Sequence, residues 1–87
     1  MYVIIVYDVS VEKVTKLCHF LRQYLNWMQN SVFEGEVTES ELESIKATIK
    51  KMINEEQDSV IIYKTTNPAF IESEQLGTPK AETSSII

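Results

Sequence analysis

The first eight residues form an unbroken run of β-branched, aliphatic and aromatic side chains that ends at the polar Asp8. A run such as Met1 to Asp8 is typical of a central β-strand that is buried on both faces. A second run of this kind, Val60 to Tyr63, lies in the second half of the chain. Two buried strands are therefore expected.

Two further segments carry apolar residues at helical spacing. Ser10 is a candidate N-cap for the first helix, Glu12 lies in its first turn, and Asn26 ends it. Thr38 and Glu41 form a capping box that starts the second helix. The expected buried stripes are Val11, Val14, Leu17, Cys18, Leu21, Tyr24 and Leu25 in the first helix, and Leu42, Ile45, Ile49, Met52 and Ile53 in the second.

Between these helices, the segment from Trp27 to Val37 is extended and is interrupted by the polar pair Asn30-Ser31. The pair predicts a bulge or a tight reversal that divides the segment into two strands. A weak strand is expected over 70–76, after the turn residues Asn67-Pro68, and a flexible tail over 78–87. The order of elements predicts an α+β domain over 1–77, with an antiparallel sheet and both helices on one face.

A sheet with helices on only one face needs a cover for its other face. With 87 residues, the chain has room for one domain and a modest core, so a second copy is the natural cover. No apolar run is long enough to cross a bilayer, and the basic leader of a secretion signal is missing. The single cysteine, Cys18, excludes an internal disulfide and indicates the reducing environment of the cytoplasm.

Charge is unevenly distributed along the chain. The formal net charge is −5, but the first 33 residues contain only two acids, Asp8 and Glu12, against Lys13, Lys16 and Arg22. These three cations are candidate phosphate contacts. A solvated surface without a phosphate partner fits the same charges equally well. A second basic set, on the second helix, consists of Lys46, Lys50 and Lys51.

Three segments occur together in an order and at spacings that carry a resemblance. They are Val6-Tyr7-Asp8-Val9, Gln29-Asn30-Ser31-Val32-Phe33-Glu34-Gly35 and Asp58-Ser59-Val60-Ile61-Ile62-Tyr63. The set resembles the CRISPR-associated endoribonuclease family, the small subunit that accompanies the integrase when new spacers are acquired. The resemblance covers residues 1–77 and implies a ferredoxin-like sandwich. It also implies a homodimer with facing sheets, in which strand 70–76 pairs with the partner's sheet.

The resemblance further implies a metal-dependent endonuclease acting on single-stranded RNA or on duplex DNA, in partnership with the integrase subunit. Asp8 matches the family's metal-binding acid, which would hold Mg²⁺ across the dimer axis, and Ser31 matches a catalytic serine. The expected nucleic-acid contacts are Tyr7, Lys13, Lys16, Arg22 and Phe33. The chain departs from many relatives by having Ser10 in place of a second acid, and lysine in place of an arginine early in the first helix.

The residues alone leave several of these roles open. Asp8 follows an apolar strand, where a carboxylate is costly unless it is solvated, paired or metal-bound, so it could instead cap the turn that follows. Phe33 could stack on a base, but an aromatic in a strand usually belongs to the core or a dimer interface. Ser31 could contact phosphate or be structural. Each lysine could simply be solvated.

Three other functions remain as alternatives. A non-catalytic scaffold of the same family would bind duplex DNA and bridge integrase dimers. A toxin-like ribonuclease would share the fold but act on cellular RNA. A small-ligand regulatory module is disfavoured, because the chain has only two glycines and no glycine-rich loop.

Overall fold

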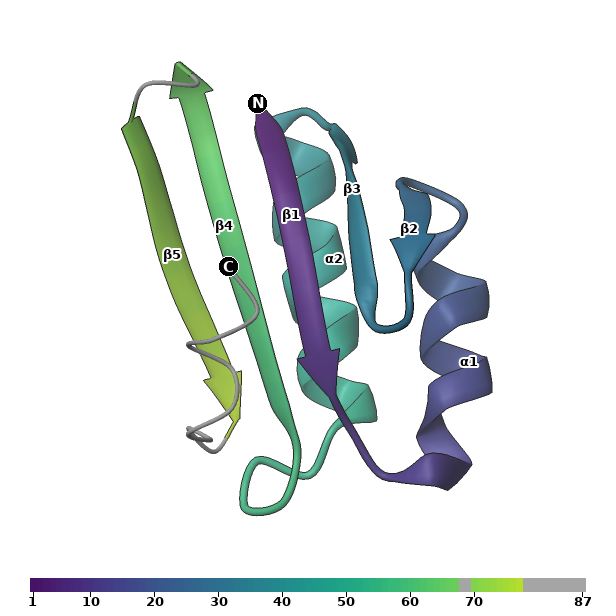
Figure 1. Cartoon of the computed structure of the whole chain (residues 1–87). Helices are drawn as coiled ribbons and strands as arrows, with labels where there is room; N and C mark the ends of the chain where they lie inside the picture. The colour runs from purple at the N-terminus through teal and green to yellow at the C-terminus, as the bar shows by residue number, and fades with distance from the viewer. Residues whose placement is uncertain (68–69, 78–87) are drawn as a thin grey trace.

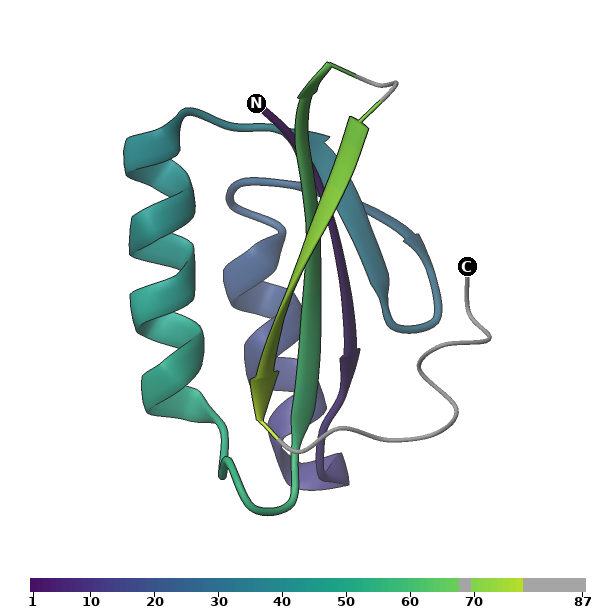
Figure 2. The same cartoon turned by 90° about the vertical axis from the view of Figure 1, so that its left-hand side faces the viewer.

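The computed structural model describes residues 1–67 and 70–77; for residues 70–73 and 75 it describes the backbone alone. A five-stranded antiparallel sheet of strand order β2-β3-β1-β4-β5 packs against two helices (Figure 1). Both helices cover the same face of the sheet, as expected (Figure 2). The elements are β1 (Tyr2–Asp8), α1 (Val11–Leu21), β2 (Asn26–Gln29), β3 (Val32–Glu36), α2 (Glu39–Met52), β4 (Ser59–Asn67) and β5 (Phe70–Gly77).

Strand β1 lies in the middle of the sheet, between β3 and β4. Its side chains alternate between the two faces, and Val3, Ile5 and Tyr7 belong to the core beneath the helices. Its apolar residues on the other face are Ile4 and Val6. The uninterrupted apolar run of β1 therefore reflects a central strand that contributes one set of side chains to the core and a second apolar set to the face that the helices do not cover.

The core lies between the helices and the sheet. Its largest fully buried side chain is Phe33 of β3, and Leu42, Ile45 and Ile49 of α2 are also buried. The capping box of α2 is confirmed: the Glu41 amide donates to Thr38 Oγ1 at 3.0 Å, and the Thr38 amide donates to Glu41 Oε1 at 2.9 Å. Helix α2 thus begins at the position that the capping-box sequence predicts.

Helix α1 ends earlier than its apolar spacing predicts. Its last residue is Leu21, and Asn26, expected to end the helix, is instead the first residue of β2. Leu25 is buried in the turn between them and packs under Gly35 of β3. The apolar residues of this turn continue the helical spacing, although their backbone is irregular. Sequence periodicity alone cannot distinguish such a turn from a further turn of helix.

The polar pair in the middle of the extended segment forms a tight reversal between β2 and β3, which confirms the expected division into two strands. Asn30 has a φ of 37°, in the left-handed region that asparagine adopts more readily than most residues. The pairing of β2 with β3 also shifts register between Trp27 and Gln29. Strand β2 is left exposed along its whole length at one edge of the sheet.

Strand β5 exists where a weak strand was expected, and it pairs antiparallel with β4 of the same chain, from Asn67↔Phe70 to Ser59↔Gly77. The expected pairing with a partner's sheet stays a prediction, because a single chain is described. Lys46 of α2, a member of the second basic set, is largely buried and lies 3.2 Å from Glu74 of β5. This ion pair ties α2 to β5.

Glycine is required at the end of β5. Gly77 has a φ of 95°, and a Cβ there would collide with the carbonyl oxygen of Asp58. The expected flexible tail, 78–87, lies outside the described residues. Within the described part of the chain, neither helix is long and apolar enough to cross a membrane.

Candidate functional site at the end of strand β1

Asp8 is the last residue of β1, where the strand leaves the sheet. It is paired in register with Ser59, and its side chain is exposed. Because Tyr7 faces the helices, the alternation of the strand directs Asp8 to the opposite face. The carboxylate therefore lies on the face that the helices do not cover.

Asp8 does not belong to a cluster of metal-ligating residues within the described part of one chain. No group of three His, Cys, Asp or Glu residues close enough to share a metal occurs among the described residues. Mg²⁺, however, binds hard oxygen ligands and commonly keeps several waters, so one or two carboxylates suffice. The donor set fits Mg²⁺ if two copies of the chain each contribute Asp8.

Ser31 lies near the same end of the sheet but on the other side. Its carbonyl accepts a hydrogen bond from the Tyr7 amide at 3.1 Å, which places Ser31 opposite Tyr7. Neighbouring strand residues point to opposite faces, so Ser31 lies on the helix side and Asp8 on the uncovered side. The fold of one chain thus does not bring the two expected catalytic side chains together.

Tyr7 and Phe33, both expected to contact nucleic acid, lie in the core. Tyr7 is 3% exposed and Phe33 is fully buried. Burial raises the pKa of the Tyr7 hydroxyl, and so does the Cys18 thiol, which lies 2.7 Å away. Stacking on a base would require both rings to leave the core, so the expected contact does not fit their positions. For Phe33, the alternative of a core residue is the one that the structure supports.

The three cations of the first 33 residues do not form one surface. The ammonium of Lys13 lies 2.5 Å from Oδ2 of Asp58 and is engaged within the protein. Arg22 lies just past the other end of α1, where its guanidinium is 5.7 Å from the centre of the Trp27 ring. Lys16 is exposed. Lys13 and Lys16 line one pocket, whereas Arg22 is not among its lining residues.

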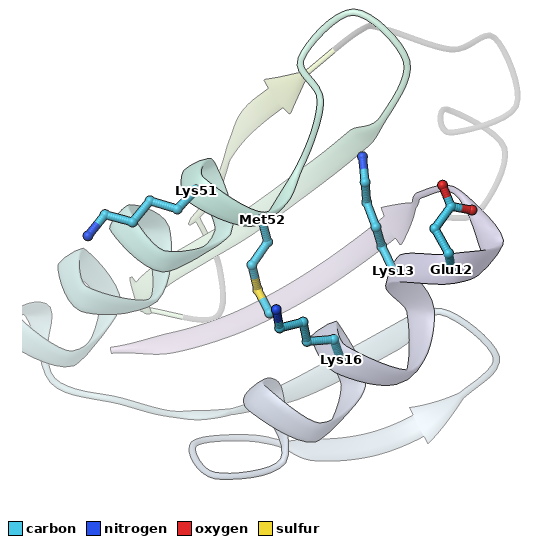
Figure 3. A pocket seen from close by; sticks show the side chains of 5 residues that line it. All are labelled: Glu12, Lys13, Lys16, Lys51 and Met52. Atoms are coloured by element: carbon cyan, nitrogen blue, oxygen red, sulfur yellow. The ribbon is translucent and has the colours of Figure 1, made fainter.

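The pocket lined by Lys13 and Lys16 lies between the two helices. The pocket has a volume of about 420 Å³ and is lined by Glu12, Lys13, Lys16, Lys51 and Met52. Figure 3 shows Lys16 beside Met52, and Lys51 extending outward from α2. The pocket thus combines Lys13 and Lys16 of the first basic set with Lys51 of the second.

Asp58 is the residue of this region that the sequence did not single out. It is 1% exposed, and its carboxylate accepts hydrogen bonds from the Ser10 amide at 3.0 Å and the Asn54 amide at 2.8 Å. Burial alone would raise the pKa of Asp58. The hydrogen bonds from Asn54, Lys13 and Ser10 outweigh burial and hold the pKa below its usual value. The sequence signals for Asp58 were an acid directly before a buried strand and its place at the start of the third segment of the resemblance.

The chain is similar to known proteins over nearly its whole length. The family model described as "CRISPR associated protein Cas2" matches residues 1–72. A protein of Methanosarcina acetivorans named CRISPR-associated endoribonuclease Cas2 is 54% identical over 87 residues, covering 100% of both chains. A protein of the same name from Pyrococcus furiosus is 64% identical over 64 residues, covering 74% of this chain and 75% of its own.

Two crystal structures have the same fold. One, described as cas2, has a TM-score of 0.74 and 42% identity, covering 93% of this chain and 91% of its own. Streptococcus pyogenes Cas2 at pH 6.5 has a TM-score of 0.69 and 32% identity, covering 75% of this chain and 86% of its own. These similarities confirm the expected ferredoxin-like α+β architecture.

Proposed function

This chain belongs to the Cas2 family of CRISPR-associated proteins, and we propose that it is a metal-dependent endoribonuclease that takes part in spacer acquisition. The single observation that carries the proposal is Asp8, an exposed carboxylate at the end of a buried strand, on the face of the sheet that the helices leave uncovered. The names of its relatives support the activity, since they are called endoribonucleases. Single-stranded RNA is the proposed substrate.

A homodimer is part of the proposal. The face of the sheet that carries Asp8 also carries apolar side chains, and no described helix or strand lies over it. By register and alternation, these side chains are Ile4, Val6, Val32, Ile61 and Tyr63. A second copy of the chain would cover this face and could bring two Asp8 carboxylates to a common axis.

The two Asp8 side chains would hold one Mg²⁺ ion. When bound, the ion would activate water and offset negative charge on the scissile phosphate. The protein's own part would be to fix both carboxylates at the strand ends and to attract the nucleic-acid backbone through cations such as Lys16. The integrase subunit is the proposed protein partner, as the family resemblance implies.

A non-catalytic scaffold is the second candidate, and a specific observation favours it. Ser31 and Asp8 lie on opposite faces of the sheet, so the Ser31 side chain of the same chain is not placed to assist catalysis at Asp8. In that case the chain would bind duplex DNA and bridge integrase dimers without cutting. The two candidates share the dimer and the basic pocket and differ only in cleavage.

Cleavage of single-stranded RNA by the purified protein should require Mg²⁺ and should stop when the metal is removed with a chelator. The measurement is single-turnover cleavage of labelled single-stranded RNA and of duplex DNA of the same sequence, with and without Mg²⁺. Restoration by added Mg²⁺ after chelation is the control for loss of fold. Tight binding of duplex DNA and integrase, with no cleavage under any of these conditions, would support the scaffold instead.

Lys16 and Lys51 should each contribute one phosphate contact. Replacing both with alanine is expected to reduce the slope of log affinity against log salt by about 1.4 for single-stranded RNA. The melting temperature should change little, because Lys16 and Lys51 are exposed. Lys50→Ala is the matched control, since Lys50 is exposed on α2 but does not line the pocket. An unchanged slope in the double variant would place the binding surface elsewhere.

A further inference from the structure

Helix α1 begins without a cap of its own. Ser10 occupies the N-cap position, but its side chain makes no capping hydrogen bond. Its Oγ is buried and has no partner among the described residues. The third residue of the helix is Lys13, where a capping box would have glutamate or glutamine. The local sequence therefore leaves the start of α1 unfixed, unlike that of α2.

Asp58 supplies the missing carboxylate from 48 residues away. Its Oδ1 accepts the hydrogen bond from the Ser10 amide at 3.0 Å, which is the bond that a glutamate at position 13 would accept in a capping box. Lys13, the residue at that position, holds the other oxygen, Oδ2, at 2.5 Å. The negative charge of Asp58 also interacts favourably with the positive, N-terminal end of the α1 dipole. A side chain from the loop between α2 and β4 thus fixes the start of α1.

This arrangement holds the backbone next to Asp8, at Ser10 further along the chain and at Ser59 across the sheet. Ser10, whose amide Asp58 binds, is two residues after Asp8. Ser59, the residue after Asp58, is paired in register with Asp8 itself. The Asn54 amide, at 2.8 Å from Oδ2, in turn anchors Asp58 to its own loop. A shift of the backbone at Asp8 would break at least one of these contacts.

Asp58 is too deeply buried to reach a substrate or a metal at the surface. Both of its oxygens are engaged, Oδ1 by one donor and Oδ2 by two. It is 1% exposed, whereas Asp8 on the neighbouring strand is exposed. Its influence on chemistry must therefore act through the backbone that it holds.

We infer that Asp58 is a positioning residue for Asp8, one that sets the direction of its carboxylate through the amide of Ser10. The inference rests on the proposed function of Asp8. Some groups orient a metal ligand without touching the metal, and their removal commonly lowers metal affinity or activity by about 10- to 100-fold. We expect a loss of this order when Asp58 is replaced.

The first test is Asp58→Asn, which keeps the size but cannot accept all three hydrogen bonds. Mn²⁺, as a probe for Mg²⁺, should bind the dimer about tenfold more weakly in titration calorimetry. The kcat for RNA cleavage should fall by a similar factor, because the metal is held less tightly. Glu56→Gln is the matched control, since it removes one charge from the same loop at an exposed position.

A second pair of variants isolates the Ser10 amide and covers the case in which Asp58→Asn does not fold. Ser10→Pro removes the N–H donor, and the φ of −61° at this position already suits proline. Ser10→Ala removes the same hydroxyl but keeps the amide. Mn²⁺ affinity should fall about tenfold further in Ser10→Pro than in Ser10→Ala.

The outcomes separate the two proposals. If the wild-type dimer neither binds Mn²⁺ nor cleaves RNA, the proposed function fails and the role of Asp58 fails with it. If the wild type does both, the positioning role is overturned by either of two results. One is a folded Asp58→Asn dimer that matches Glu56→Gln, and the other is a Ser10→Pro variant that matches Ser10→Ala.

Discussion

Replacing Asp8 with asparagine is expected to abolish metal-dependent cleavage while the dimer still forms and still binds nucleic acid. Asparagine keeps the size of the side chain and removes the negative charge that a Mg²⁺ site needs. Stability should hold or rise, because two carboxylates facing each other across a dimer axis repel when no ion lies between them. Cleavage of single-stranded RNA, sedimentation and the melting temperature together measure these three effects.

The same substitution distinguishes a metal ligand from a structural acid. If Asp8 mainly caps the turn after β1, asparagine would be a fair substitute and activity would survive. Full cleavage by pure Asp8→Asn protein would therefore contradict the metal assignment. Spacer acquisition in cells gives a second readout: retention of acquisition with loss of cleavage would favour the scaffold, and loss of both would indicate catalysis during acquisition.

Truncation after Asn67 is expected to weaken or abolish dimerisation. It removes β5 from the edge of β4, and with it Glu74, the partner of the largely buried Lys46. An exposed β4 edge would have unpaired backbone groups, and Lys46 would lose an ion pair. Sedimentation or small-angle scattering measures the change. An equally tight dimer of the truncated chain would show that β5 plays no part in the dimer.

A cysteine pair can then determine which chain β5 joins. Val60 and Leu76 are paired in register between β4 and β5, and both are buried. Val60→Cys with Leu76→Cys, in a Cys18→Ala background, should oxidise to a covalent dimer if β5 pairs with the partner's β4, as the family resemblance implies. A cross-link confined to single chains would show that β5 stays with its own β4.

The sequence predicted those elements whose signals are local. The capping box of Thr38 and Glu41, the apolar runs of β1 and β4 and the reversal at Asn30 each depend on residues a few positions apart, and each is confirmed. The end of α1 was misplaced because Leu25 continues the helical spacing from a turn. Pairing over long distances, as between Lys13 and Asp58, left no periodic signal and was missed.

The resemblance supplied a set of site residues but not the faces on which they lie. Asp8 is exposed on the uncovered face, whereas Tyr7 and Phe33 are buried on the other. The sequence alone would have placed Tyr7 and Asp8 on opposite faces of the sheet, because the side chains of neighbouring strand residues alternate between the faces. No comparable count links Lys16 to Lys51, because the helix packing that brings them to one pocket is a property of the tertiary structure.

The two helices should acquire their structure at different times as the chain folds. Helix α2 carries its capping box within four residues, so its first turn can form by local contacts alone. The start of α1 depends on Asp58 and cannot be completed until the loop before β4 has docked. Closing a contact of such long range carries an entropic cost that local contacts avoid. Substitutions in the α2 cap should therefore slow folding, whereas substitutions at Asp58 should mainly accelerate unfolding.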